Sequence, residues 1–359
     1  MNVVKQNLGI DVDSKELKVS FQQLMDDQSK KVKGSRTFKN NLKGFEYLEE
    51  WLKKKMSSDL VLNITMEATG VYYENLAYHF SEKENFKVHV VLPNTSKAYL
   101  KSLNLKSKTD EIDAKGLGQM GIERNLKTWM PMTSQMRTIR KIVRERIRLV
   151  KEKTMVSNQL HAESASYKPN AKSLVRYKER IDFLKQQIKS IKKELVQIVK
   201  QDENLRQRID HVCTIKGVRF ITAIGVIAEY KGFVLFSNRN QVVSFAGYDV
   251  TKNESGTSVR GKTKISKKGN SHVRQMLYMS AMSAARLDDH HREYYARIVN
   301  KTGIKMKGNV AIQRKLLLLI YTLFKNNKHY DPEHYLKTQQ IVAPENDGII
   351  RKRTEEILL

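Results

Sequence analysis

A long stretch without glycine in the middle of the chain constrains the fold more than any other feature. No glycine occurs between residues 134 and 208, and apolar side chains recur there at helical spacing in two stripes, 139–155 and 184–198. Pro169 interrupts the helical pattern between the two stripes. Because two long charged helices must bury these stripes, an antiparallel or intersubunit coiled coil is the simplest account. The stretch therefore predicts a long helical coiled-coil region at 131–208.

The region before it, residues 1–130, alternates between strand and helix patterns. Apolar and polar residues alternate at 8–12 and 17–21 around a turn, which predicts a β-hairpin. After the hairpin we expect a helix, a strand, a helix, a strand and a helix, at residues 45–52, 60–66, 73–80, 88–92 and from Thr109 onward. This is the element order of an α/β fold of the RNase H-like (RuvC-like) kind.

The region after it, residues 209–340, is expected to form a compact, mainly α-helical domain. The elements expected there are a helical segment punctuated by glycine, a basic loop and two further helices, at residues 215–230, 252–270, 272–287 and 310–324. The tail at 341–359 is polar, and we expect it to be peripheral.

The charge of the chain indicates its partner. Lysine and arginine number 66 against 38 aspartates and glutamates, a formal net charge of +28. So many positive charges repel one another in the folded state unless a polyanion binds the surface, and phosphate backbones are the commonest polyanion. A basic membrane binder carries an apolar anchor, whereas the longest apolar run, residues 316–320, is far shorter than the ~20 residues of a membrane span. We expect a nucleic-acid partner and no membrane.

The rest of the composition excludes several other classes of protein. Hydrophobic residues make up 40% of the chain, enough to build a folded core. The single cysteine, Cys213, excludes an internal disulfide and a cysteine-rich zinc site. The first residues have neither the apolar segment nor the cleavage site of a secretory signal. We therefore expect a protein of the cytoplasm of a bacterial or archaeal cell.

Four carboxylates lie on elements that can bring them together. Asp11 shares a strand face with Gly9, Glu67 ends a second strand, and Asp110 and Asp113 are three residues apart at the opening of a helix. Helical residues at this spacing are neighbours, with Cβ atoms about 5–6 Å apart. Oxygen-only ligands suit Mg²⁺ or Mn²⁺, and two such ions can support phosphodiester cleavage.

Each of these carboxylates also has an ordinary structural interpretation. Asp110 can complement the helix dipole behind a Thr109 cap, Glu67 can be an exposed strand end, and Asp11 can be a turn residue. The order D…E…D-x-x-D on the expected elements favours the metal site over these separate roles.

The sequence motifs around the carboxylates resemble those of a known family. GIDV at 9–12, MEATG at 66–70 and KTDEIDA at 108–114 resemble the RuvC-like half of the DEDD-type insertion-sequence transposases, which include the bridge-RNA-guided recombinases. The second half also resembles that family, in the motifs TIKGVRFITA at 214–223, GYDV at 247–250, SG at 255–256, KKGN at 267–270 and RQMLY at 274–278. The resemblance covers nearly the whole chain in the right order.

The resemblance implies roles for particular residues. Asp11, Glu67, Asp110 and Asp113 would hold Mg²⁺, with Mn²⁺ as the alternative, and Ser255 would be the nucleophile of a transposase domain at 209–340. The chain would act as a homo-oligomer, a dimer or tetramer, on donor and target DNA. A structured non-coding guide RNA would pair with both DNAs, by analogy with other guided systems.

A basic segment surrounds the serine. Between Lys252 and Arg274 there are seven lysines and arginines against one glutamate, so contact with a phosphate backbone is favoured over a merely solvated loop. The residues expected to bind nucleic acid are Lys216, Arg219, Lys252, Arg260, Lys262, Lys264, Lys267, Lys268 and Arg274. Arginines at 140, 144, 146 and 148 on the first long helix are expected to add contacts.

The sequence favours an RNA-guided, site-specific DNA recombinase of an insertion sequence over two rivals. One is a RuvC-like metal-dependent nuclease that cuts branched DNA with water and forms no covalent intermediate. The other is a non-catalytic scaffold that binds RNA or DNA. A covalent protein–DNA bond at Ser255 separates the recombinase from the nuclease, because a serine nucleophile stays attached to the cut strand.

Overall fold

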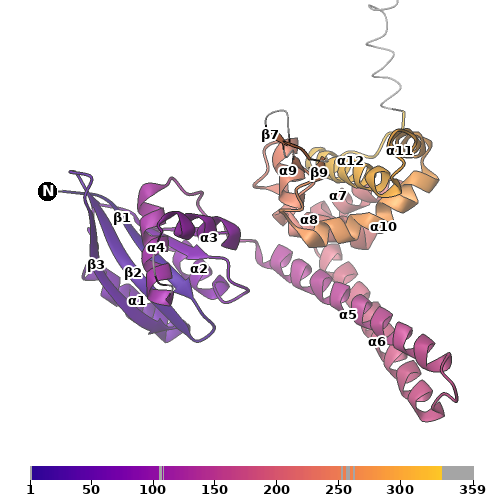
Figure 1. Ribbon diagram of the computed structural model, residues 1–359, viewed down its shortest axis with the longest axis horizontal. Coiled ribbons are helices and arrows are strands. Elements are labelled where there is room, and N and C mark those ends of the chain that lie inside the picture. The colour runs from indigo at the N-terminus through magenta and orange to yellow at the C-terminus, as the bar shows by residue number, and fades with distance from the viewer. Residues whose placement is uncertain are drawn as a thin grey trace, which may run out of the picture. The chain divides into compact units, whose positions relative to one another are not determined.

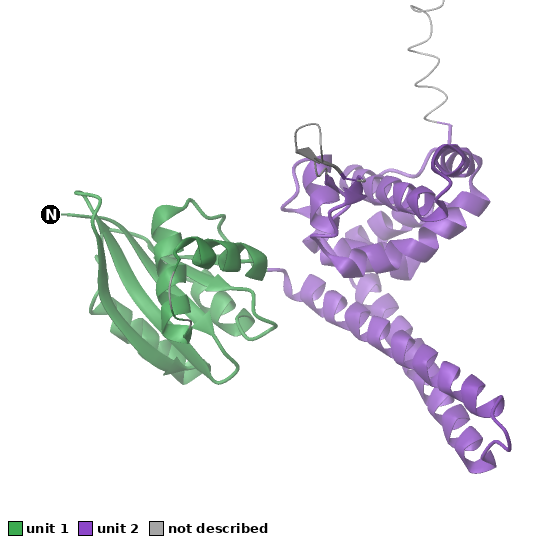
Figure 2. Ribbon diagram, in the orientation of Figure 1, with its two compact units in different colours: residues 1–131 green, residues 132–359 purple. Residues whose placement is uncertain are grey.

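The structure is a computed structural model in which the chain forms two compact units, residues 1–131 and 132–359 (Figure 2). It describes residues 2–104, 107, 109–251, 254–255, 259–261 and 263–333, and only the backbone at 254–255 and 259–260. The tail expected at 341–359 lies outside the described residues. The two units are described separately below.

Unit 1 is built on a five-stranded mixed sheet (Figure 1). Its strands are β1 (Val3–Val12), β2 (Glu16–Met25), β3 (Lys30–Lys39), β4 (Leu62–Glu67) and β5 (Phe86–Val91). They lie in the order β3-β2-β1-β4-β5, with β1, β2 and β3 antiparallel and β4 and β5 parallel to β1. The predicted hairpin and the α/β character of this region are confirmed. Strand β3 was not predicted, because most of its side chains are exposed and polar and show no apolar alternation.

Helices cover both faces of this sheet. They are α1 (Leu42–Lys53), α2 (Glu74–Ser81), α3 (Pro93–Ser102) and α4 (Asp110–Glu123). One face carries the apolar core, where Leu8, Ile10 and Phe21 belong to the same buried cluster as Leu48 of α1 and Phe80 of α2. The other face is polar and packs against α4.

Helix α4 rests directly on the backbone of β1. A Cβ atom at Gly9 would collide with the Ala114 carbonyl oxygen and the Gly118 nitrogen, so only glycine allows this approach. Asn7 donates its side-chain amide to the Gly118 carbonyl oxygen at 2.9 Å, and Gln22 on β2 donates to the Lys115 carbonyl oxygen at 2.7 Å. The helix is therefore held on the sheet by main-chain contact and side-chain amides rather than by a large apolar interface.

Unit 2 is mainly helical. Its helices of eight residues or more are α5 (Ser134–Ser164), α6 (Ala171–Lys200), α7 (Glu203–Cys213), α8 (Phe220–Glu229), α9 (Arg239–Ala246), α10 (Ser271–Leu287), α11 (Asp289–Thr302) and α12 (Lys305–Asn326). Helices α5 and α6 pack along each other as an antiparallel pair (Figure 1). At one end of the pair Val156, Ile181 and Leu184 form a small apolar cluster of their own. At the other end Ile139, Ile191 and other residues of both helices join the main core of the unit.

The second half departs from the sequence prediction in three places. The glycine-punctuated helical segment expected at 215–230 begins with a turn, and α8 starts only at Phe220. Gly217 in that turn has a φ of +93° and lies against the backbone of Ser280 and Ala284, which a side chain would prevent. Helix α11 was not predicted because it is strongly polar. The expected basic loop at 252–270 contains the short strands β7 (Glu254–Ser255), β8 (Val259–Arg260) and β9 (Lys264–Ile265), and β6 (Val250–Thr251) comes just before it.

No helix in the described part of the chain combines the length and the apolar character that crossing a membrane requires.

The contact between Gly9 and α4 gives the first testable prediction. Replacing Gly9 with alanine forces α4 away from the sheet, because the new methyl group meets helix backbone rather than a flexible side chain. We expect Gly9→Ala to lower the free energy of unfolding of unit 1 by about 1–3 kcal/mol, the usual cost of overpacking. Urea unfolding measures this change. Gly34→Ala on β3 is the control, because the atoms nearest to its methyl group belong to the side chains of Trp51 and Lys55, at 3.0 Å or more. Equal losses in both variants would contradict the prediction.

Candidate active site

Two of the predicted carboxylates come together at one edge of the sheet in unit 1. Strands β1 and β4 are parallel neighbours, and their last register pair joins Ile10 to Met66. Asp11 and Glu67 are the next residues of the two strands, so both lie at the carboxyl ends of adjacent parallel strands. Since side chains alternate along a strand, Asp11 shares its face with Gly9, the face that α4 covers.

The other two carboxylates belong to the start of α4. Thr109 caps this helix, its hydroxyl oxygen accepting a hydrogen bond from the Ile112 nitrogen at 3.3 Å. Asp110 is the first residue of the helix, and Asp113 stands one turn later, next to the Ala114 carbonyl that lies over Gly9. The predicted cap is thus present, and the same helix also carries its acidic turn to the ends of β1 and β4.

The electrostatics of Asp11 show that the four carboxylates are near one another. Partial burial, together with the negative charges of Asp110, Asp113 and Glu67, raises the pKa of Asp11 to about 6. Lys18 lies opposite Asp11 on β2 but forms its ion pair with Glu16, at 3.6 Å. Within the described residues no lysine or arginine forms an ion pair with Asp11 or Glu67, so these two carboxylates have no basic partner there.

This donor set suits a hard divalent cation, although its side chains do not close around one point. Carboxylate oxygens are the ligands that Mg²⁺ and Mn²⁺ prefer, and negative charges close to one another favour a cation. Across the described part of the chain, however, no three His, Cys, Asp or Glu side chains converge in the arrangement of a metal site. The carboxylates therefore lie close enough to interact electrostatically, but their side chains do not surround one point.

Ser96 is a residue of this site that the sequence did not reveal. It is fully buried on α3 and donates a hydrogen bond from its hydroxyl to a Glu67 carboxylate oxygen at 2.6 Å. Helix α3 was itself missed, although Pro93 at its first position was a recognisable signal for a helix start. Nothing in the local sequence indicates that Ser96 faces Glu67, because that contact joins different elements.

The predicted nucleophile belongs to unit 2. Ser255 is the second residue of β7 and pairs with Val259 of β8. Its side chain lies outside the described part of the structure, as does that of Arg260, and Lys252 and Lys262 lie outside it altogether. The structure therefore places the backbone of Ser255 in a two-stranded ladder.

Comparisons with known proteins identify the family. A model for DEDD transposases of the IS110 type, described as "Transposase", matches residues 8–169, and a model described as "Transposase IS116/IS110/IS902 family" matches residues 209–296. The two matches together span more than half of the chain. The chain belongs to the IS110 family of transposases. It is accordingly an enzyme of DNA recombination and transposition.

Two curated relatives resemble this transposase along most of its length. The pilin gene-inverting proteins of Moraxella bovis and Moraxella lacunata are each 28% identical to it over 301 residues, covering 82% of this chain and 90% of theirs. Among solved structures, a Ppx/GppA family member from Aquifex aeolicus aligns over 95% of this chain and 99% of its own. That alignment has 9% identity and a TM-score of 0.20, too low to support any argument about the fold.

The other predicted basic residues of the transposase fall into two groups. Lys216 and Arg219 are exposed on either side of the Gly217 turn, and Lys264, Lys267 and Lys268 are exposed in and after β9. Arg274 instead is partly buried, and its guanidinium donates to the carbonyl oxygens of Ala246 and Gly269, at 2.7 and 3.3 Å. The first group is available to a partner, whereas Arg274 holds the end of the basic loop to α9.

An ion pair between the buried Glu229 and the partly exposed Arg144 holds the other side of this loop in place. Glu229 at the end of α8 is 4% exposed and accepts two hydrogen bonds from Arg144 of α5, at 2.7 and 2.8 Å. It also accepts one from Asn270, at 2.6 Å, while Asn270 caps α10. Burial opposes the charge of Glu229, but these hydrogen bonds outweigh it and hold the pKa of the carboxyl below its usual range. Arg144, expected to contact nucleic acid, thus makes a structural contact.

The crowding of the carboxylates predicts a pH-dependent stability. Because the pKa of Asp11 is raised in the folded state, its contribution to stability is present below pH ~4 and is lost as the pH rises through about 6. In EDTA at pH 7.5 we expect Asp11→Asn to raise the free energy of unfolding by about 1 kcal/mol, less than the whole shift implies because the side chain is partly exposed.

Thermal unfolding at pH 5 and pH 7.5 measures this effect. The control is Asp13→Asn, since the exposed Asp13 carboxyl has its pKa lowered by hydrogen bonds from Lys15 and Ser14 and should gain nothing from neutralisation. An Asp11→Asn variant that is no more stable than wild type at pH 7.5 would show that the four charges are not crowded.

Proposed function

We propose that this transposase is a site-specific recombinase of an insertion sequence that cuts and rejoins DNA with the carboxylates of unit 1 and Ser255 of unit 2. The observation that carries the proposal is the placement of Asp11 and Glu67 at the carboxyl ends of adjacent parallel strands, with Asp110 and Asp113 near enough to raise the pKa of Asp11 further, beyond the effect of its burial. Perturbed carboxylates that converge from distant parts of a sequence are typical of functional sites. Both halves of the chain match the same transposase family, which supports a joint role.

We further propose that unit 1 has an RNase H-like (RuvC-like) fold and that α5 and α6 act as a coiled coil. The strand order β3-β2-β1-β4-β5, with an antiparallel meander and two parallel strands, supports the first proposal. The antiparallel packing of α5 on α6 supports the second.

Asp11, Glu67, Asp110 and Asp113 would hold Mg²⁺, with Mn²⁺ as the alternative. When bound, the metal supplies positive charge at the scissile phosphate and lowers the pKa of an attacking hydroxyl. The chain's own contribution is the arrangement of the ligands. The packing of Gly9 against α4 sets Asp110 and Asp113 over the strand ends, and Ser96 orients one oxygen of Glu67.

Ser255 would attack the phosphorus of the DNA backbone. Its Oγ loses a proton and forms a new ester bond to phosphorus, while the bond from phosphorus to one sugar oxygen breaks and that oxygen takes up a proton. Reversal with a different sugar hydroxyl rejoins the strand, so the number of phosphodiester bonds is conserved. The family resemblance suggests that the carboxylates of one copy work with the serine of another in a dimer or tetramer.

The names of the relatives support rejoining. Moraxella pilin gene-inverting proteins, by their name, invert a gene, and an inversion requires that both ends be cut and joined again. The exposed lysines and arginine at 216, 219, 264, 267 and 268 would contact phosphates of the donor and target DNA, with Lys252, Arg260 and Lys262 of the same basic segment.

The role of Ser255 can be tested directly. On an element-end DNA with Mg²⁺, we expect wild type to leave a covalent protein–DNA adduct on a denaturing gel. Ser255→Ala should lose the adduct and reduce cleavage by ~1,000-fold or more, the order of loss when a nucleophile is removed. Ser258→Ala, in the same basic segment, is the matched control and should keep both.

Two results would contradict the recombinase proposal. Equal cleavage by wild type and Ser255→Ala with no adduct indicates a nuclease that uses water. If Asp113→Asn leaves every DNA transaction of the wild type unchanged, the carboxylates are not catalytic and the chain is a binding scaffold.

A structured guide RNA is the remaining part of the proposal, and it rests on the family resemblance together with the net charge of +28. We expect one short RNA of defined sequence, encoded beside the gene, to copurify with the full chain when the flanking non-coding DNA is present. Sequencing the copurified nucleic acid measures this. Recovery of only random cellular RNA, in the amounts that an unrelated protein of similar charge retains, would reject guidance while leaving the cleavage chemistry intact.

A further inference from the structure

Unit 2 contains a large groove that takes no part in the proposed cleavage, although Lys264 and Lys267 at its wall are among the residues proposed to contact phosphates. Its volume is about 1130 Å³, slightly above the roughly 300–1,000 Å³ of a typical small-molecule site, so it has room for a segment of a polymer. Helices α5, α8, α10, α11 and α12 and the short strands β6 and β9 contribute to its wall. The apolar part of the lining includes Tyr278, Met279, Tyr294, Ile304 and Met306.

The charge of the groove has one sign. Its charged lining residues are all basic, namely Arg146, Lys264, Lys267, Arg274, Lys307 and Arg314. The Arg146 guanidinium is half-buried, its Nε has no hydrogen-bond partner among the described residues, and burial lowers its pKa. A buried N–H of a cation that has no acceptor favours an anionic ligand.

A second, smaller hollow of about 470 Å³ continues from the first. The two share Tyr294, Ala311 and Arg314, so Tyr294 forms part of both walls. Around Tyr294 the Arg297 guanidinium lies 5.1 Å and the Lys315 ammonium 5.0 Å from the ring centre. His290 also lines this hollow, and Glu293 is its one acidic lining residue.

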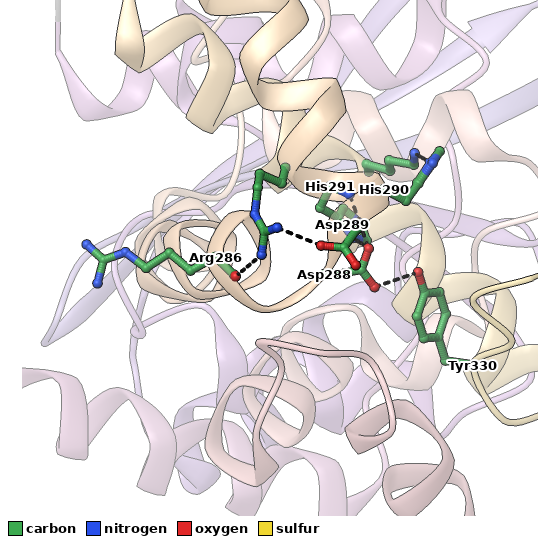
Figure 3. A network of polar contacts seen from close by, with 8 residues as sticks. Arg286, Asp288, Asp289, His290, His291 and Tyr330 are labelled. Carbon is green, nitrogen blue, oxygen red and sulfur yellow. Dashed lines mark hydrogen bonds and ion pairs between the residues drawn. The ribbon is translucent and has the colours of Figure 1, made fainter.

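The polar network next to this hollow fixes α11. Asp288 is 2% exposed and caps the helix by accepting from the His291 nitrogen at 3.1 Å, and it accepts from the Tyr330 hydroxyl at 3.2 Å (Figure 3). Arg292 donates to Asp289 and to the Arg286 carbonyl oxygen. These contacts set the start of α11, and with it the positions of His290 and Tyr294.

We propose that this groove binds unpaired nucleotides of a nucleic-acid strand, with bases against Tyr278, Met279 and Tyr294 and phosphates at Arg146, Arg314 and the smaller hollow. Single-stranded nucleic acid combines flat apolar bases with a regular anionic backbone, and proteins bind it with aromatic side chains set among cations. The groove offers both, side by side. A double helix keeps its bases stacked inside and cannot fill the apolar part.

A second copy of the chain is the other polymer that an apolar groove suggests. Each copy carries a net charge of +28, and a groove lined by six cations and no carboxylate repels such a surface. Charge complementarity therefore favours a polyanion. The proposal deepens the proposed function, because strand exchange exposes unpaired nucleotides, but binding can be measured without metal and without cleavage.

The test compares two methionines that are equally suited to substitution. Met279 is 63% exposed and lines the groove, whereas Met155 on α5 is 50% exposed and lies outside it. Met279→Glu and Met155→Glu add the same charge at a helix surface, so both should fold and both weaken non-specific binding equally. Fluorescence anisotropy in EDTA with labelled dT12, rU12 and a 12-base-pair duplex measures the affinities of the full chain.

We expect Met279→Glu to weaken dT12 or rU12 binding by about 10-fold or more relative to Met155→Glu, the effect of losing one stacked base, and to leave duplex binding equal in the two variants. A loss of affinity for dT12 identifies the bound strand as DNA, and a loss of affinity for rU12 identifies it as RNA. Arg314→Gln should lower single-strand affinity more than Arg286→Gln, an exposed arginine outside the groove.

Equal affinities of the two methionine variants for both single strands would overturn the proposal. So would a shift in oligomeric state by sedimentation velocity in Met279→Glu alone with unchanged single-strand binding, because that result assigns the groove to contact between copies. If Ser255→Ala cleaves as well as wild type without an adduct, the catalytic proposal fails, but binding measured in EDTA is unaffected, so failure of the catalytic proposal and failure of this one are distinguishable.

Discussion

The direct contact of helix α4 with the backbone of β1 is the constraint on which the candidate active site depends. A helix normally stands off a sheet by the length of its side chains, whereas here Gly9 and Gly118 remove that spacing. Asn7 and Gln22 then hydrogen-bond to helix carbonyl oxygens and fix the position of the helix along the strands. As a result the acidic first turn of α4 lies over the strand ends that carry Asp11 and Glu67.

That placement costs stability in the metal-free protein. Four like charges near one another, one of them half-buried, raise the pKa of Asp11, and no described lysine or arginine pairs with it. Stability sacrificed at a site usually reflects a function that needs the unfavourable arrangement. A divalent cation at this edge of the sheet would turn the same repulsion into attraction.

In unit 2, side-chain contacts hold a basic loop in place. Arg274 binds one part of the loop to α9. The buried Glu229 of α8 pairs with Arg144 of α5 and also accepts a hydrogen bond from Asn270, which holds the end of the loop. The cations of the loop that remain exposed adjoin the apolar groove between the helices. The surfaces proposed for phosphates and for bases therefore lie next to each other in this unit.

The sequence by itself determined the features that depend on local pattern or on recognisable words. Alternation over 8–12 and 17–21 was enough for the hairpin, the glycine-free stripes for α5 and α6, and Thr109 for the start of α4, because each is a property of neighbouring residues. The motifs and their order were enough to recognise the transposase family. Tertiary structure alone decided the rest. Strand β3 is held by pairing with β2 rather than by an apolar pattern, Ser96 reaches Glu67 only across two elements, and Arg144 meets Glu229 85 positions away. These contacts join residues that are distant in the chain, and no local periodicity encodes them.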